Sequence, residues 1–172
     1  TMDYAPNEVG ILYFCDHILP LILRQEPDAR LYIVGQRPSP AVSALAERHP
    51  NNVIVTGFVD DVRPYLQRAA VCVVPLLNGG GTRLKILEAL AMRKPVVSTS
   101  VGAEGLPLVD GQEIVIADDP ESFARAVLAL LADQALGRRL AEKGHSVVTQ
   151  QFDWKQVALR LDEAWLEATD LA

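Results

Sequence analysis

Short apolar runs alternate with longer stretches of helical periodicity along this chain, and that alternation limits the folds open to it. Leu31–Val34 stops at Gly35, and the β-branched run Val71–Val74 stops at Pro75. Strands are expected at Leu31–Val34, Val53–Thr56, Val71–Val74, Pro95–Ser98 and Ile114–Ile116. Wholly apolar strands that alternate with helices form a parallel sheet covered on both faces. The sequence therefore predicts an α/β chain with a Rossmann-like, doubly wound parallel sheet whose carboxyl strand ends carry any function.

Helices are predicted between the strands and after them. Those between the strands are expected at Asn7 to about Arg24, Pro40–His49, Asp60 or Asp61 to about Arg68, and about Arg83–Arg93. A helical C-terminal segment follows, with helices expected at Glu121–Ala132, Ala135–Gln151 and Asp153–Thr169. Candidate caps are Asn7, Asp118 or Asp119, and Asp153. Trp154 and Trp165 share one helix face, for which we expect core packing, with docking against another domain as the alternative.

The start of the chain does not fit this pattern, because a doubly wound sheet normally opens with a strand. Here the first helix is reached by Asn7, and Thr1–Tyr4 is at most a short remnant of that strand. In this fold the first strand lies in the middle of the sheet, where a gap leaves two rows of backbone groups unpaired. Either Thr1–Tyr4 fills the position, or a neighbouring chain does, or the domain is only marginally stable.

Composition excludes several classes of protein. A length of 172 residues with 49% hydrophobic and 22% charged residues predicts one globular domain. A net charge of −6 argues against a general nucleic-acid binder. Cys15 and Cys72 lie in apolar runs without metal-ligand spacing, so we expect small buried side chains and no zinc site. No membrane span or signal peptide is visible, and the expected location is the cytoplasm. We expect packing or surface roles for His17, His49 and His145.

The segment from Asn78 to Glu88 is the most informative part of the chain. Gly79–Gly81 follow a predicted strand and precede a predicted helix, so exposed backbone N–H groups and the helix dipole favour an anion such as a phosphate. Arg83 and Lys85 add two positive charges, and Glu88 is suited to accept hydrogen bonds from vicinal hydroxyls. The plainer alternatives are a flexible turn, a solvated helix start, and an ion pair between Lys85 and Glu88.

Several stretches, in this order along the chain, carry a resemblance to a known family. They are Thr1–Tyr4 with Pro6-Asn7, Leu31–Gly35, Val55–Val59, Val73–Pro75, Asn78–Ala91, Lys94–Thr99 and Gly102–Leu106. The chain resembles the C-terminal, donor-binding half of the GT-B retaining glycosyltransferases of group 1 (the GT4-like type). The resemblance covers nearly the whole chain; it is specific for the family and weak for the substrate.

This resemblance implies roles for individual residues. Gly79, Gly80, Gly81, Thr82, Arg83 and Lys85 are expected to hold the donor diphosphate, and Glu88 the ribose. Gly35, Arg37, Phe58, Val59 and Glu104 are candidates for the base or sugar pocket. A strand-ending turn is the plainer interpretation of Gly35 to Arg37, and a core role that of Phe58 and Val59. The family often has a second glutamate where this chain has Gly80, so Glu104 is a candidate substitute carboxylate.

The resemblance also implies what the whole enzyme does. Residues 1–172 are expected to form one nucleotide-sugar-binding domain, without the N-terminal acceptor domain and without a self-sufficient catalytic set, so that the chain alone is inactive. The expected reaction moves a sugar from a nucleoside-diphosphate sugar to an acceptor in cell-surface glycan or glycolipid synthesis, with no cofactor or metal. The absent half is the part through which a peripheral membrane contact is conceivable. The alternatives are half of a sugar-nucleotide epimerase and a non-catalytic nucleotide-sugar-binding module.

Overall fold

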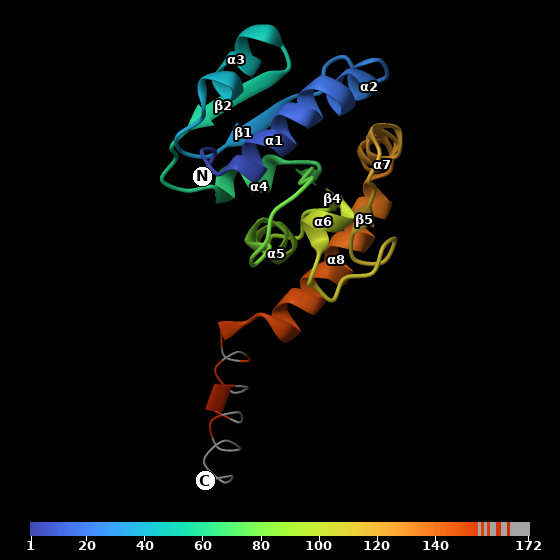
Figure 1. Cartoon of the computed structure of the whole chain (residues 1–172). Coiled ribbons are helices and arrows are strands. Elements are labelled where there is room, and N and C mark those ends of the chain that lie inside the picture. The colour runs from blue at the N-terminus through green and yellow to red at the C-terminus, as the bar shows by residue number, and fades with distance from the viewer. Residues whose placement is uncertain (155, 157, 159–160, 163–164, 166–172) are drawn as a thin grey trace.

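The computed structural model describes residues 1–154, 156, 158, 161, 162 and 165, and within them helices alternate with short parallel strands (Figure 1). The strands are β1 (Leu31–Val34), β2 (Val53–Gly57), β3 (Cys72–Val74), β4 (Val96–Ser98) and β5 (Val115–Ile116). The helices are α1 (Ala5–Tyr13), the π-helical η1 (Phe14–Ile18), α2 (Leu19–Leu23), α3 (Pro40–Arg48), α4 (Arg63–Arg68), α5 (Leu84–Ala91), α6 (Ser100–Ala103), α7 (Pro120–Ala132) and α8 (Gln134–Gln151). The predicted α/β class is confirmed, and each predicted strand is found within one residue at each end.

The strands form two sheets rather than the single five-stranded sheet that the sequence suggested. β1 pairs with β2, and β4 lies between β3 and β5, with every pairing parallel. Of the three alternatives that the sequence left open for the opening strand, the structure excludes the first, because Thr1–Tyr4 is not a strand. The backbone N–H of Met2 donates to the carbonyl of Gln36 (2.8 Å), so this segment lies beyond the carboxyl end of β1 and not beside it. Among the described residues, β1 and β3 therefore each have one paired edge.

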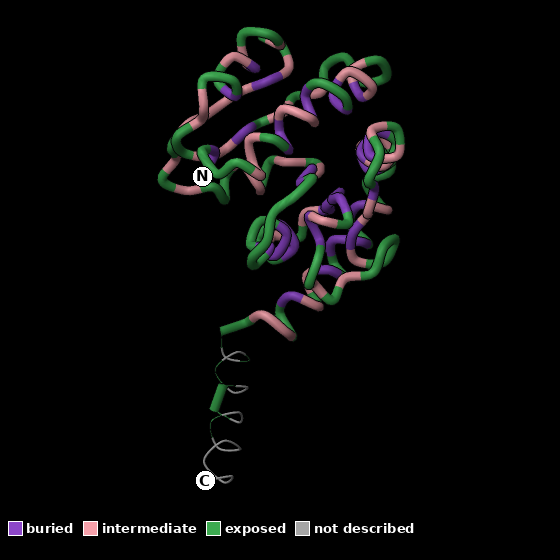
Figure 2. Tube along the Cα trace, viewed as in Figure 1, coloured by how far each residue is buried: buried purple, intermediate pink, exposed green. Residues whose placement is uncertain are grey.

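Apolar side chains cover both faces of the strands. In β4, Val96 belongs to the core cluster with α5 and α8, whereas Val97 belongs to the cluster with α1, η1, α2, α3 and α7. Adjacent residues of a strand point to opposite faces, so the two clusters mark the two sides of the sheet. β4 is fully buried, and the buried segments lie along the middle of the molecule (Figure 2). The doubly wound arrangement is therefore preserved around a sheet in two parts.

Burial also fixes the state of the two thiols. Cys15 is completely buried, as expected, while Cys72 is partly exposed. Desolvation raises the pKa of Cys15 to about 12 and that of Cys72 to about 11. Because the thiolate is the reactive form, both side chains are protonated and poorly nucleophilic at neutral pH.

The first helix begins earlier than predicted and is interrupted by a π-helical segment. α1 begins at Ala5 with Tyr4 as its N-cap, so the expectation that Asn7 caps the helix is wrong. The stretch then widens into η1, where the backbone N–H of Leu19 reaches the carbonyl of Phe14. Pro20 has no N–H to donate, and a local π-turn lets the helix continue past it.

The C-terminal helices begin at acidic caps. The carboxylate of Asp119 accepts a hydrogen bond from the backbone N–H of Ser122, which confirms one of the two predicted caps, and Asp133 caps α8. The helix predicted at Asp153–Thr169 lies largely outside the described residues. Trp154 and Trp165 are 85% and 71% exposed, so the expected core packing is wrong. No helix within the described part of the chain is long and apolar enough to cross a membrane.

Gly10 allows α1 to approach the segment that follows β3. A Cβ atom at Gly10 would lie 2.5 Å from the carbonyl oxygen of Pro75, which is backbone and cannot rotate away. A glycine in a helix interior is unfavourable, but this contact requires it. The absence of a side chain here brings α1 against the carboxyl end of β3.

We predict that Gly10→Ala destabilises the protein by about 1–3 kcal/mol, because the new methyl group overpacks a backbone contact. In an unobstructed helix the same change stabilises by up to about 1 kcal/mol. Gly137→Ala in α8 is the matched control, since its Cβ would first meet Pro95 Cγ at 3.4 Å. Urea unfolding of the two variants measures the difference, and equal midpoints would contradict the contact.

Candidate functional site

The candidate site lies at the carboxyl ends of the parallel strands, where the loop after β3 leads into α5. Gly79 and Gly81 have φ angles of 116° and 89°, which side-chain-bearing residues rarely adopt. Gly79 also lies so close to Pro6 that an added Cβ would be 3.1 Å from the proline Cβ. Gly80 has open space around it and no left-handed φ. Two of the three glycines are thus required by the conformation of the loop.

The buried side chain of Thr99 fixes the position of the loop after β3. Thr99, at the carboxyl end of β4, is buried, and its hydroxyl donates to the carbonyl of Leu76 at 2.5 Å. The same hydroxyl accepts a hydrogen bond from the backbone N–H of Gly102 at the start of α6. Thr99 therefore ties the loop after β3 to the loop after β4.

Arg83 is turned into the loop rather than out to solvent. It is the N-cap residue of α5 and is 7% exposed. Its Nη2 lies 3.2 Å from both the carbonyl oxygen of Gly79 and Oε2 of Glu104, while its buried Nε has no hydrogen-bond partner. A buried cation with an unpaired donor is costly unless an acceptor is supplied. Glu104 is 73% exposed, so the ion pair is open to competition from another anion.

Lys85 reaches across to α1. Its Nζ donates to Oδ1 of Asn7 at 2.5 Å. Desolvation, followed by the charge of Arg83, lowers the pKa of Lys85, whereas Glu88 raises it. The ion pair between Lys85 and Glu88 that the sequence allowed is not formed among the described residues. A bound anion would favour the charged form of Lys85 and restore its pKa.

A cavity of about 750 Å³ opens beside these residues and extends between β1 and β3. We call it the inter-sheet cavity. Its carboxyl end is lined by Asn7, Gly10, Lys85 and Glu88, and the rest of its wall is mostly apolar. Glu88 is exposed. Its carboxylate is therefore available to a ligand at the mouth of the cavity.

The structure brings together one group of the predicted site residues. Gly79–Gly81, Thr82, Arg83, Lys85 and Glu88 share the loop and α5, and Glu104 joins them through Arg83. The remaining candidates belong to the other sheet: Gly35 and Arg37 follow β1, and Phe58 and Val59 follow β2.

The four candidates that follow β1 and β2 differ in their contacts and in their exposure. Gly35 packs against the side chain of Met2. Arg37 has a φ of 55° and forms an ion pair with Asp3 at 3.0 Å, as a residue of a strand-ending turn can. Phe58 is 69% exposed, which contradicts a core role, and Val59 is partly buried. All four follow the carboxyl ends of β1 and β2, as the glycine loop follows that of β3, and no described hydrogen bond joins them to that loop.

Asn7, Pro6 and Thr99 support the site, although no local sequence pattern predicts this role for them. Asn7 is separated from Lys85 by 78 residues, so no local pattern could reveal the pair. Pro6 and Asn7 do stand in a stretch that carried the family resemblance, which was the available signal. The assembled site is a cationic pocket of backbone N–H groups with a nearby carboxylate, suited to a phosphorylated ligand with hydroxyl groups.

α5 adds to this preference for an anion. It starts without a side-chain hydrogen bond to its first N–H groups and without an acidic residue in its first turn. The positive end of its dipole is therefore uncompensated. Within the described residues, no group of three or more His, Cys, Asp or Glu side chains is placed to hold a metal ion.

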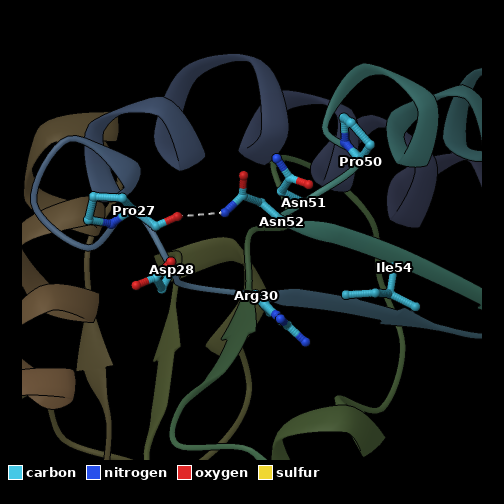
Figure 3. A pocket seen from close by; sticks show the side chains of 7 residues that line it. All are labelled: Pro27, Asp28, Arg30, Pro50, Asn51, Asn52 and Ile54. Carbon is cyan, nitrogen blue, oxygen red and sulfur yellow. Dashed lines mark hydrogen bonds between the residues drawn. The ribbon is translucent and has the colours of Figure 1, made fainter.

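A second hollow of about 510 Å³ lies at the opposite ends of β1 and β2 (Figure 3). Asn52 accounts for its shape, because its Nδ2 donates to the carbonyls of Pro27 and Ala29 at 2.9 Å. These bonds join the turn before β1 to the turn before β2. The side chains of Asp28 and Arg30 point in different directions, so they do not converge on one ligand position (Figure 3). The hollow is explained by the packing of these turns.

We predict that Gly79→Ala lowers the melting temperature by several degrees, because the new side chain is strained at φ 116° and meets Pro6. Gly80→Ala is the control and should leave stability nearly unchanged, since nothing lies within 4 Å of its Cβ position. Differential scanning fluorimetry compares the two. A Gly80 variant as unstable as the Gly79 variant would refute this description of the loop.

Comparisons with known proteins agree with this geometry. The family model for "Glycosyl transferases group 1" matches residues 1–133. A lipopolysaccharide core biosynthesis glycosyltransferase of Rhizobium meliloti, LpsE, is 39% identical over 103 residues, which cover 56% of this chain and 28% of LpsE. The chain spans less than half the length of the curated relatives it matches.

Solved structures give the same fold. The C-terminal domain of a group 1 glycosyl transferase, LpcC of Francisella tularensis, superposes with a TM-score of 0.72 at 20% identity, covering 84% of this chain and 80% of that one. Anabaena HepE in complex with UDP superposes with a TM-score of 0.76 at 16% identity, covering 88% and 44%. The fold is that of the C-terminal-type domain of GT-B enzymes. The chain belongs to the group 1 glycosyl transferase family.

Proposed function

We propose that this chain binds the nucleoside-diphosphate sugar donor of a retaining glycosyltransferase. The observation that carries the proposal is Arg83, a buried guanidinium with an unpaired Nε, placed at the end of a glycine loop and beside a helix start. A diphosphate oxygen would supply the missing acceptor and the counter-charge together. The same contacts would stabilise the negative charge that develops on the leaving diphosphate during transfer.

In this proposal the donor has one orientation, with its diphosphate on the glycine loop and its ribose at Glu88. The diphosphate lies on Gly79–Gly81, Thr82, Arg83 and Lys85, and the ribose hydroxyls face Glu88 at the mouth of the inter-sheet cavity. Phe58, Val59, Gly35 and Arg37 are the candidates for the base, and Glu104 for sugar hydroxyls. HepE, whose fold this chain shares, has been solved in complex with UDP.

The acceptor and the rest of the reaction centre are assigned to a second domain outside these 172 residues. The proposal includes an inactive chain when it is isolated, no cofactor, and an acceptor of the glycolipid or cell-surface glycan class. LpsE, a relative, acts in lipopolysaccharide core biosynthesis. Any peripheral membrane contact and the cytoplasmic location belong to the same proposal.

We predict that Lys85→Met weakens binding of the nucleotide sugar at least tenfold, because it removes a cation beside the diphosphate. Lys143→Met, at an exposed position of α8, is the control and should bind as the unaltered chain does. A thermal-shift screen of UDP-, GDP- and ADP-sugars first identifies the donor, and isothermal titration then gives the affinities. A ligand at 100 times its dissociation constant should stabilise the chain by about 2.7 kcal/mol.

The pH dependence provides a further check on Lys85. Its pKa is lowered in the free protein, so binding of an anion is accompanied by proton uptake where the free lysine is partly neutral. Affinity should therefore fall as the pH rises toward the alkaline range, and it should fall less in Lys85→Met. Equal affinity in Lys85→Met and the unaltered chain would contradict the assignment of the diphosphate site.

We predict that Glu88→Gln reduces the preference for a ribonucleotide sugar over its 2′,3′-dideoxyribose analogue, because the amide loses charge-assisted acceptance of the two hydroxyls. Glu47→Gln, at an exposed position of α3, is the matched control. Titration of both analogues against both variants gives the preference. If Glu88→Gln retains it in full, the hydroxyls are read by another group.

A further inference from the structure

Glu104 places a carboxylate directly beside the proposed position of the diphosphate. Its Oε2 lies 3.2 Å from Nη2 of Arg83, and its side chain is exposed whereas that of Arg83 is buried. A guanidinium has several N–H donors, so Arg83 can keep this ion pair while its unpartnered Nε donates to a second anion. A ligand phosphate bound to Arg83 would therefore lie next to a negative charge of the protein.

The backbone of Glu104 is held in place by α6, of which it is the C-cap residue. The hydroxyl of Thr99 caps the start of this helix by accepting a hydrogen bond from the backbone N–H of Gly102. The carboxylate of Asp118 accepts two further bonds, from the backbone N–H and the hydroxyl of Ser100. A Cβ atom at Gly102 would lie 2.9 Å from a carbonyl oxygen of β3, so α6 packs directly on the end of that strand. The carboxylate of Glu104 is thus presented from a fixed backbone.

The order of the side chains along α5 determines which part of a donor faces Glu104. Arg83 is the N-cap residue, Lys85 lies in the first turn, and Glu88 follows in the next turn. A donor whose ribose is at Glu88 and whose diphosphate passes Lys85 has its second phosphate at Arg83. The group bonded to that phosphate then lies beside Glu104.

A terminal phosphate that is free differs from an esterified one in charge and in hydrogen bonding. A phosphate that carries a sugar keeps one ionisable oxygen, whereas a free terminal phosphate loses a second proton with a pKa of about 6. The additional negative charge faces the carboxylate of Glu104, and like charges repel. A carboxylate accepts hydrogen bonds but donates none, so it can pair with sugar hydroxyls and not with a deprotonated phosphate.

We propose, on the basis of the function proposed above, that Glu104 makes the site prefer a diphosphate esterified to a sugar over a nucleoside diphosphate with a free terminal phosphate. Arg83 attracts both ligands, and Glu104 repels the free phosphate more strongly than the ester. Transfer breaks the bond between the sugar and the diphosphate oxygen, which keeps the electron pair, so the product carries the free phosphate. Glu104 therefore favours the donor over this product in competition for the site.

Three pairs of ligands test this role on the 172-residue chain: UDP, GDP and ADP, each with its own β-methyl ester. The base is the same within a pair, so its contribution cancels, and the methyl group removes the second negative charge without adding a hydroxyl. Glu104→Gln removes the carboxylate but keeps an oxygen that can accept from Arg83, and Glu47→Gln, at an exposed position of α3, is the matched control. Isothermal titration at about pH 8, above the second pKa of the phosphate, gives the dissociation constants.

We expect Glu104→Gln to lower the preference for the ester, taken as the ratio of the two dissociation constants, by about fivefold, mostly through tighter binding of the free diphosphate. Glu47→Gln should retain the preference. Because the ratio is measured on one protein, a loss of stability in the variant cancels from it.

A change of the same factor in both members of a pair would overturn the proposal, because a carboxylate that serves only to hold Arg83 does not distinguish them. An unchanged preference in Glu104→Gln would overturn it as well. If none of the three pairs binds the unaltered chain, the donor site itself is wrong, and the role of Glu104 is wrong with it.

Discussion

The contact between the first turns of α1 and the loop after β3 holds together two sheets that share no strand pairing. Gly10 permits the close approach to Pro75, and Pro6 packs against Gly79. The Lys85–Asn7 bond completes the contact from the side of α5. Because no ladder of hydrogen bonds between described residues fixes one sheet against the other, their relative position depends on these contacts and on the shared apolar core. The geometry of the candidate site depends on the same few atoms.

The cationic groups of the site are held in an incompletely satisfied state. Arg83 is buried with a carbonyl and an exposed carboxylate as its partners, and its Nε has none. An unsatisfied buried donor costs about 1–3 kcal/mol, and a ligand that supplies the acceptor would remove this cost. The pKa of Lys85 is lowered as well, first by desolvation and then by the charge of Arg83. Buried polar groups without a hydrogen-bond partner are expected at sites where a bound ligand supplies that partner.

Strands and helix caps could be predicted from the sequence where the residues that determine them are adjacent along the chain. Val71–Val74 and Val96–Ser98 are continuous β-branched or small-residue runs, and the structure places strands there within a residue. The conformation of the glycine loop also has a local signal, because Gly79 and Gly81 adopt φ angles that other residues rarely do. Asp119 was a predictable cap because its carboxylate acts only three residues away.

Features that depend on tertiary packing could not be predicted in this way. The inward turn of Arg83 toward Glu104 follows from the position of α6, which is too short to leave a periodic pattern. The π-turn before Pro20 and the division of the sheet also depend on how neighbouring segments pack. The sequence left the conformation of Thr1–Tyr4 open, and its position beyond the carboxyl end of β1 follows from the bond between Met2 and Gln36.

The inter-sheet cavity connects the edges of β1 and β3 with the candidate site. Its wall runs from the unpaired edges of β1 and β3 to Lys85 and Glu88, and Met2 and Asn7 line it from the first residues of the chain. A contact that restricts Met2 and the start of α1 would also restrict the acceptor that Asn7 offers to Lys85. Ligand binding at the mouth would in turn fix Lys85. Since such coupling is reciprocal, a gain in affinity at one end must appear as an equal gain at the other.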